Sequence, residues 1–189
     1  MVILDPGGTW ERIEQQQNGI ARVFAISTLP LLLVVSAIEA YGLMTWGRQH
    51  DMSGKAKTVG TDLLVRYEAT QMVLAVVLLF FGAWLLKLIA EGFHRRHSYQ
   101  QSFVTAAYAF GPLFLCRALN AIPGVNLWIT WAIGILLVVA ALYRGVPRIM
   151  RPDPSSALGL YMMASIVLVL IAGLANFVAI MVLDEKIPA

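Results

Sequence analysis

Residues 72–86 read MVLAVVLLFFGAWLL, an apolar run without a charged side chain on any helical face. Residues 131–143, WAIGILLVVAALY, have the same character. A transmembrane β-strand alternates apolar and polar residues over about ten positions, whereas both runs are apolar throughout. Helices that are surrounded by lipid or by other apolar helices have this pattern. The two runs therefore predict membrane-spanning helices.

The composition extends this conclusion to the whole chain. Of its 189 residues, 59% are hydrophobic and 13% are charged, whereas about a quarter of a typical soluble domain is charged. The mean hydropathy is +0.72. These values exclude a soluble domain, a disordered chain and a nucleic-acid-binding module. Since Cys116 is the single cysteine, an intramolecular disulfide scaffold is excluded as well.

Runs with few charges mark the expected spans, because an ionised side chain near the bilayer centre costs at least ~2.5 kcal/mol. We predict an all-α, polytopic integral membrane protein with five transmembrane helices. They lie at about 23–43, 71–90, 102–119, 125–143 and 160–183, within a membrane domain over residues 23–189. The longest connection between them is Met44 to Thr70. Residues 1–22 form a polar cytoplasmic segment, in which Trp10 and Ile13 belong to a short helix lying on the membrane surface; a frayed tail is the alternative.

The distribution of Lys and Arg predicts the orientation of the bundle. With the N-terminus inside, the inner side carries eight of these residues and the outer side six. The inner loops at 91–100 and 144–154 are short and rich in Arg, whereas the long outer connection also contains acidic residues. The positive-inside rule therefore favours a cytoplasmic N-terminus. We expect Arg95, Arg96, Arg148 and Arg151 to contact anionic lipid.

Glu39 and Arg117 are the most informative charges, because each lies inside an otherwise apolar span. An intramembrane ionisable residue suggests a functional site by default. In the predicted topology both lie within about one turn of the outer end of their helices. They can form an inter-helix clamp, extend separately to the interface, or provide a handle for a proton or a substrate. The structural interpretations are favoured.

The third span contains the segment AAYAFGP, residues 106–112. Pro112 cannot donate a hydrogen bond to the carbonyl of Tyr108, so a kink is expected there. Together with Gly111, these residues predict either a small polar notch or, more simply, a close helix contact. Gly173, Ala175 and Asn176 in the fifth span predict a similar contact, with Asn176 as its hydrogen-bonding member.

The sequence gives no sign of an enzyme, a metal site or a cofactor. His94 and His97 share one helical face, but Arg95 and Arg96 between them disfavour a cation. No nucleophile elbow or zinc-binding HExxH motif is present. We also find no two carboxylates at a shared depth that could perform acid–base chemistry.

Several motifs resemble the bacterial branch of the Yip family, the five-span relatives of the eukaryotic Ypt/Rab-interacting membrane proteins. They are LDPGGTWERI before the first span, the AAYAFGP segment and LYRGVPRIM at residues 142–150. The matching residues are Pro6, Trp10, Tyr108, Pro112, Arg144 and Gly145. The resemblance implies a five-helix protein with a cytoplasmic N-terminus, in a bacterial inner membrane. Eukaryotic members are implicated in contacting prenylated small GTPases, but the short N-terminal region gives no reason to extend that partner to this chain.

These observations favour a non-enzymatic membrane protein, a scaffold or accessory subunit of a larger membrane assembly. Its expected partners are membrane lipids and other integral membrane proteins or further copies of itself, with no nucleic acid. The alternative is a small transporter or channel component that uses Glu39, Arg117 and the Pro112 kink. A third hypothesis, a lipid-binding or membrane-shaping protein, depends on Trp10, Ile13 and the basic loops.

Overall fold

A computed structural model describes residues 10, 13, 19–49, 56–57, 60–93, 98–150, 152–153 and 155–184. Within these residues, five helical segments are long and apolar enough to cross a membrane. The prediction of an all-α, five-span protein is therefore confirmed. The segments run from Ile20 to Thr45, Thr61 to Gly92, Tyr99 to Ala121, Leu127 to Met150 and Ala157 to Leu183.

Three of the five segments combine an α-helix with a helical stretch of different pitch. In the first, α2 (Ile20–Val23) continues through the π-helix η1 (Phe24–Thr28) into α3 (Leu29–Thr45). The third is α5 (Tyr99–Cys116) followed by the 3₁₀-helix η2 (Arg117–Ala121), and the fourth is α6 (Leu127–Gly145) followed by the π-helix η3 (Val146–Met150). The second and fifth are α4 (Thr61–Gly92) and α7 (Ala157–Leu183). Two short strands, β1 (Arg48–Gln49) and β2 (Ala56–Lys57), pair antiparallel between α3 and α4.

The second helix begins ten residues earlier than the sequence predicted, at Thr61 instead of Gln71. Its 32 residues span about 48 Å at a rise of about 1.5 Å per residue, more than the ~30 Å of a hydrocarbon core. Asp62, Arg66 and Glu68 therefore lie on the helix and not in a loop. The expectation was wrong here because a charged sequence ends an apolar run without ending a helix.

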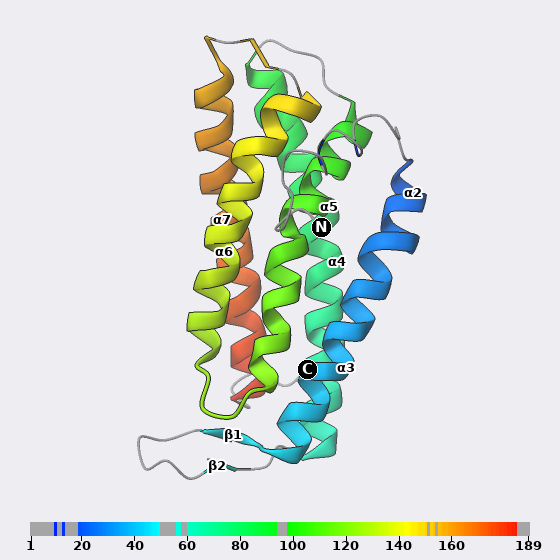
Figure 1. Ribbon diagram of the computed structural model, residues 1–189, viewed down its shortest axis with the longest axis vertical. Helices are drawn as coiled ribbons and strands as arrows, with labels where there is room; N and C mark the ends of the chain where they lie inside the picture. The colour runs from blue at the N-terminus through cyan, green and yellow to red at the C-terminus, as the bar shows by residue number, and fades with distance from the viewer. Residues whose placement is uncertain are drawn as a thin grey trace.

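Successive helices run in opposite directions, and α5 lies at the centre of the bundle (Figure 1). It packs against both α4 and α6, while α7 packs mainly on α4. The helix α3 lies to one side, where it contacts η2 and α4. In the apolar stretch of the α5 segment, 72% of the residues are buried inside the bundle, against 28% in that of α7. The polar residues near the end of α5 are therefore held inside the bundle.

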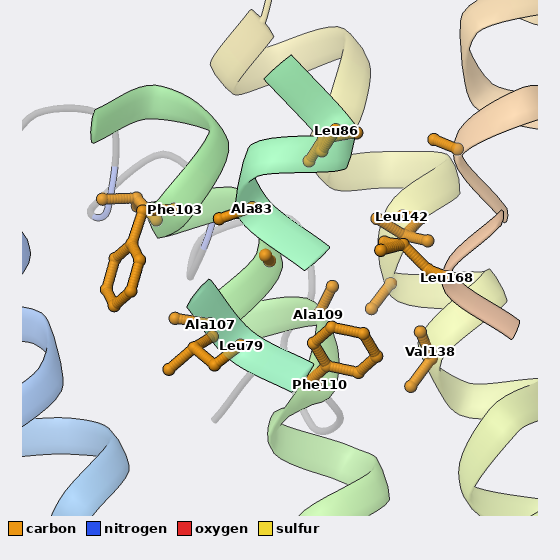
Figure 2. Packing of buried hydrophobic residues seen from close by; sticks show 14 of the residues in the cluster. Leu79, Ala83, Leu86, Phe103, Ala107, Ala109, Phe110, Val138, Leu142 and Leu168 are labelled. Atoms are coloured by element: carbon orange, nitrogen blue, oxygen red, sulfur yellow. The ribbon is translucent and has the colours of Figure 1, made fainter. Parts of the chain in front are cut away.

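The core depends on small residues of α5. Ala106 and Ala109 are fully buried, and they allow the neighbouring helices to approach closely. Leu79 of α4, Phe110 of α5 and Leu142 of α6 belong to the same buried cluster (Figure 2). The helix begins with a capping box, in which Ser98 accepts a hydrogen bond from the backbone of Gln101 and the Gln101 side chain accepts one from the backbone of Ser98.

Trp10 and Ile13 are buried in the bundle, with exposed fractions of 0% and 7%. We expected both on the membrane surface, as part of an interfacial helix, and that expectation was wrong. Trp10 meets Tyr108 edge-on, with 6.3 Å between the ring centroids. The reason is a space beside Gly145 that accepts the indole ring. The other residues of the 1–18 segment lie outside the described residues.

Candidate functional site

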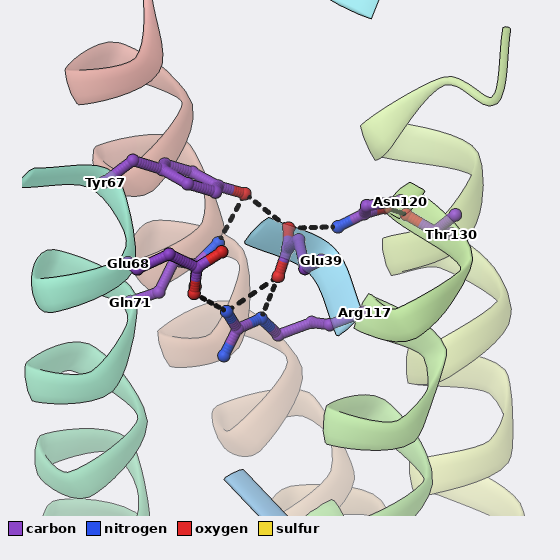
Figure 3. A network of polar contacts seen from close by, with 7 residues as sticks. All are labelled: Glu39, Tyr67, Glu68, Gln71, Arg117, Asn120 and Thr130. Carbon is purple, nitrogen blue, oxygen red and sulfur yellow. Dashed lines mark hydrogen bonds and ion pairs between the residues drawn. The ribbon is translucent and has the colours of Figure 1, made fainter. Parts of the chain in front are cut away.

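Glu39 of α3 and Arg117 of η2 form an ion pair inside the bundle (Figure 3). Arg117 donates from Nε and Nη2 to one carboxylate oxygen, Glu39 Oε2, at 3.0 and 2.7 Å. The Glu39 side chain is fully buried, and that of Arg117 is 11% exposed. Of the three alternatives for these charges, the geometry is that of an inter-helix clamp.

The other oxygen of Glu39 is satisfied by two further donors. The Tyr67 hydroxyl of α4 donates to Glu39 Oε1 at 2.8 Å, and Asn120 Nδ2 of η2 donates to the same atom at 2.8 Å. A buried carboxylate is tolerated where hydrogen bonds and an opposite charge replace its water. Glu39 thus connects α3 to both α4 and η2.

A second layer of polar side chains holds these partners in place. Gln71 donates to the Tyr67 hydroxyl at 2.9 Å, and the Thr130 hydroxyl donates to Asn120 Oδ1. Since Thr130 belongs to α6, the network, defined here as the polar cluster, joins four of the five membrane segments (Figure 3). Its members are Glu39, Tyr67, Glu68, Gln71, Arg117, Asn120 and Thr130.

Glu68 is the member that corrects the sequence analysis most directly. Arg117 Nη2 donates to Glu68 Oε2 at 3.1 Å, so two carboxylates share one guanidinium group. Glu39 and Glu68 therefore lie at a shared depth. The search for carboxylates at a shared depth that could perform acid–base chemistry missed this pair, because Glu68 was assigned to the loop before the second span, whereas it lies on the extended start of α4.

Close backbone approach brings α3 to this cluster. A side chain at Gly42 would overlap Ala121, the last residue of η2, so only glycine allows α3 to approach here. The turn after η2 uses Gly124, whose φ of 83° favours glycine. Asn126 then caps α6 by accepting a hydrogen bond from the backbone of Trp128. These local features place Asn120 within reach of Thr130.

A cavity of about 50 Å³ adjoins the polar cluster. Its walls include Gln71, Arg117, Asn120 and Thr130 together with apolar side chains from α4, α5 and α7. By volume it holds a few water molecules, because one water requires about 10–15 Å³ on this measure. Glu39 does not line it.

The second grouping of predicted residues lies at the opposite end of the bundle. Trp10 packs between Tyr108 and Gly145. Three of the six residues that carry the family resemblance therefore meet. Arg144, a fourth, is exposed, and Pro6 lies outside the described residues. Pro112 is buried within α5.

Gly111 does not form the expected packing notch, because nothing lies within 4 Å of a Cβ placed there. Close contacts occur instead at Gly42, Gly134 and Gly145. In the fifth span, Gly173 packs against the ring of Trp131. Asn176 was expected to form a hydrogen bond, but its Nδ2 has no partner among the described residues.

The predicted lipid-contacting arginines are only partly placed. Arg148 is half-buried in η3, whereas Arg95, Arg96 and Arg151 lie outside the described residues, as do His94 and His97. Among the residues that the structure describes, no group of three or more His, Cys, Asp or Glu side chains is arranged to hold a metal ion.

Comparison with known proteins gives one match. The model of the Yip1 domain family matches residues 1–177. No curated protein and no solved structure matches the chain.

Proposed function

Because the chain belongs to the Yip1 domain family, we propose that it is a non-enzymatic integral membrane protein acting as a scaffold or accessory subunit. The observation that carries this proposal is that the polar side chains within the membrane segments bind one another inside the bundle. Glu39 and Arg117 are used to hold α3 against the bundle. What remains for interaction is an extensive apolar surface within the membrane, which suits lateral contact with other membrane proteins.

That outer surface consists of large side chains. Exposed examples are Phe81 and Trp84 on α4, Leu136 on α6, and Leu170 and Leu174 on α7. Small residues such as Ala106 and Ala164 are buried inside the bundle. A partner would therefore pack against large aliphatic and aromatic side chains.

A transporter or channel component is the second candidate, and the cavity beside Arg117 is the observation in its favour. A solute path would have to reach the buried carboxylate, yet Glu39 is fully enclosed by its partners. The volume of the cavity also has room for only a few water molecules. The scaffold interpretation therefore has more support.

We further propose that the N-terminus is cytoplasmic and that the protein resides in a bacterial inner membrane. The support for the orientation is the concentration of Arg near the helix ends at residues 91–100 and 144–154. In this orientation the strands β1 and β2 lie outside. Arg144, exposed at the end of α6, then faces the anionic cytoplasmic leaflet.

Photo-crosslinking in the native membrane tests the scaffold proposal. A photoreactive amino acid is placed at Leu170, which is 61% exposed, and in a control at Leu168 two residues earlier, which is fully buried. The same exchange at Leu136 probes α6. A scaffold or subunit should give discrete protein adducts from an exposed position and not from Leu168.

Gentle-detergent purification with mass spectrometry then shows whether the crosslinked protein also remains attached in a fixed ratio. Adducts to lipid alone from all exposed positions, together with a companion-free purified protein, would contradict the scaffold proposal. Solute flux into vesicles containing the purified protein would instead support the transporter.

A further inference from the structure

We propose that the cavity beside Arg117 binds an uncharged acceptor oxygen of a membrane lipid, of the kind an ester carbonyl presents. This site is independent of the scaffold proposal, because it concerns a bound lipid and not a protein partner. The argument depends on the donors around the cavity, their charge state and their depth in the membrane.

Three residues lining the cavity carry buried N–H groups with no hydrogen-bond partner in the described part of the chain. They are Arg117 at Nη1, Trp131 at Nε1 and Asn176 at Nδ2. Each comes from a different membrane segment, η2, α6 and α7. Since guanidinium and indole groups have donors and no acceptors, the missing partner must be an acceptor. Leaving such buried donors unpaired is unfavourable, because each has lost its hydrogen bonds to water.

The local charge favours an uncharged acceptor over an anion. The positive charge of Arg117 is already shared by Glu39 at 2.7 Å and Glu68 at 3.1 Å. A phosphate or carboxylate in the cavity would add a further negative charge near these two carboxylates. A carbonyl oxygen accepts hydrogen bonds without that repulsion.

The walls favour a lipid over water alone. Alongside its polar groups, the cavity is lined by apolar side chains such as Leu78, Leu113 and Ala172. Water against such a wall loses hydrogen bonds, whereas an acyl ester presents both an oxygen and a hydrocarbon chain. Trp131 and Asn176 are themselves only half-buried. Beside them, Trp128 and Phe177 are exposed on the outer surface, where lipid lies.

The depth is that at which ester groups occur. Arg117 directly follows α5, and Thr130 lies in the first turn of α6. The end of α5 and the start of α6 lie at the end of the bundle that carries β1 and β2 (Figure 1). Lipid ester groups lie at the boundary between the hydrocarbon core and the headgroups, close to the ends of membrane helices.

Native mass spectrometry of the full-length protein in mixed micelles tests this site. The probes are diacyl phosphatidylglycerol, its dialkyl ether analogue without carbonyl groups, and diacyl phosphatidylcholine. We expect both diacyl lipids to be retained more strongly than the ether lipid. Trp131→Phe, which removes the indole N–H and keeps an aromatic ring, should reduce diacyl retention by about two- to tenfold, the effect of one hydrogen bond.

Trp84→Phe is the matched control, because Trp84 is 47% exposed on α4 and does not line the cavity. Its diacyl retention should equal that of the unmodified protein. Asn176→Leu provides a second test of the donors, and Trp131→Phe decides the outcome if that variant does not fold. Equal retention of diacyl and ether lipids would show that no ester carbonyl is bound, and would overturn the proposal. Retention that follows headgroup charge in place of the ester linkage would overturn it as well.

Discussion

The indole ring of Trp10 occupies the space beside Gly145 in which another residue would carry its side chain. A Cβ added at Gly145 would lie 2.6 Å from Cη2 of Trp10 and 2.7 Å from its Cζ2. Trp10 also meets Tyr108 edge-on. The N-terminal segment is thus anchored between α5 and the end of α6 by a fully buried aromatic ring, and glycine at position 145 is a condition for that anchor.

Gly145→Ala should destabilise the protein by about 1–3 kcal/mol, the usual cost of overpacking a core. The matched control is Gly92→Ala at the end of α4, because a Cβ at Gly92 meets nothing within 4 Å. In the control, the better helix propensity of alanine should raise stability by up to about 1 kcal/mol. The thermal unfolding midpoint in one detergent distinguishes the two variants.

The same substitution in a Trp10→Ala background should cost little, because the clashing ring is absent. Trp10→Ala alone removes a fully buried side chain and should cost about 3–5 kcal/mol. The double variant should then be no less stable than Trp10→Ala. Additive losses would mean that Gly145 matters for a reason other than Trp10.

Glu39→Gln should destabilise the bundle far more than Glu68→Gln. Glu39 is fully buried and accepts hydrogen bonds from Tyr67, Arg117 and Asn120. A glutamine there turns its amide NH2 group, a donor, toward one of these donors. Breaking a buried ion pair in this way costs about 3–5 kcal/mol. Glu68 is 15% exposed and accepts from Arg117, so its glutamine variant keeps an acceptor and should cost about 1 kcal/mol or less. Chemical unfolding in lipid micelles measures both losses, and equal losses would argue against Glu39 as the centre of the cluster.

Exchanging the two charges, Glu39→Arg with Arg117→Glu, should restore stability only in part. The new carboxylate at position 117 would face Glu68, which now accepts a hydrogen bond from Arg117 Nη2. Adding Glu68→Gln removes that repulsion, so the triple variant should be more stable than the double. Full rescue by the double exchange would show that Glu68 contributes nothing to the clamp. The comparison requires the unfolding midpoints of both single variants as references.

The five spans could be predicted because a helix in lipid requires a long apolar run, and such runs can be recognised directly in the sequence. Glu39 and Arg117 could be singled out for the same reason, since each interrupts such a run. Tyr67 and Glu68 could not, because a charged stretch at the start of α4 looks like a loop. The helical spacing of Asp62 and Arg66, which form an i, i+4 ion pair at 2.8 Å, was the signal that the helix continued.

Packing between distant segments was harder to predict. Trp10 and Ile13 are three residues apart with polar residues between them. This spacing suits either a membrane surface or a groove in the bundle, and the space beside Gly145 decides between the two. Likewise, the sequence around Gly42, Gly111 and Gly134 does not show which of these glycines lies at a close helix contact. Their roles differ because Ala121 lies beside the first and Leu113 beside the third, whereas the second faces open space.

The proposed orientation predicts which positions a membrane-impermeant thiol reagent reaches. Gly19, Gly60 and Gly92 are exposed, and a Cβ at each has nothing within 4 Å, so each accepts a cysteine without a clash. The buried Cys116 is first replaced by alanine to remove background labelling. In right-side-out vesicles, Gly60→Cys, at the start of α4, should react at once. Gly19→Cys and Gly92→Cys, at the other end of the bundle, should react only after permeabilisation. The reverse pattern would place the N-terminus outside, and with it the polar cluster would lie in the cytoplasmic half of the membrane.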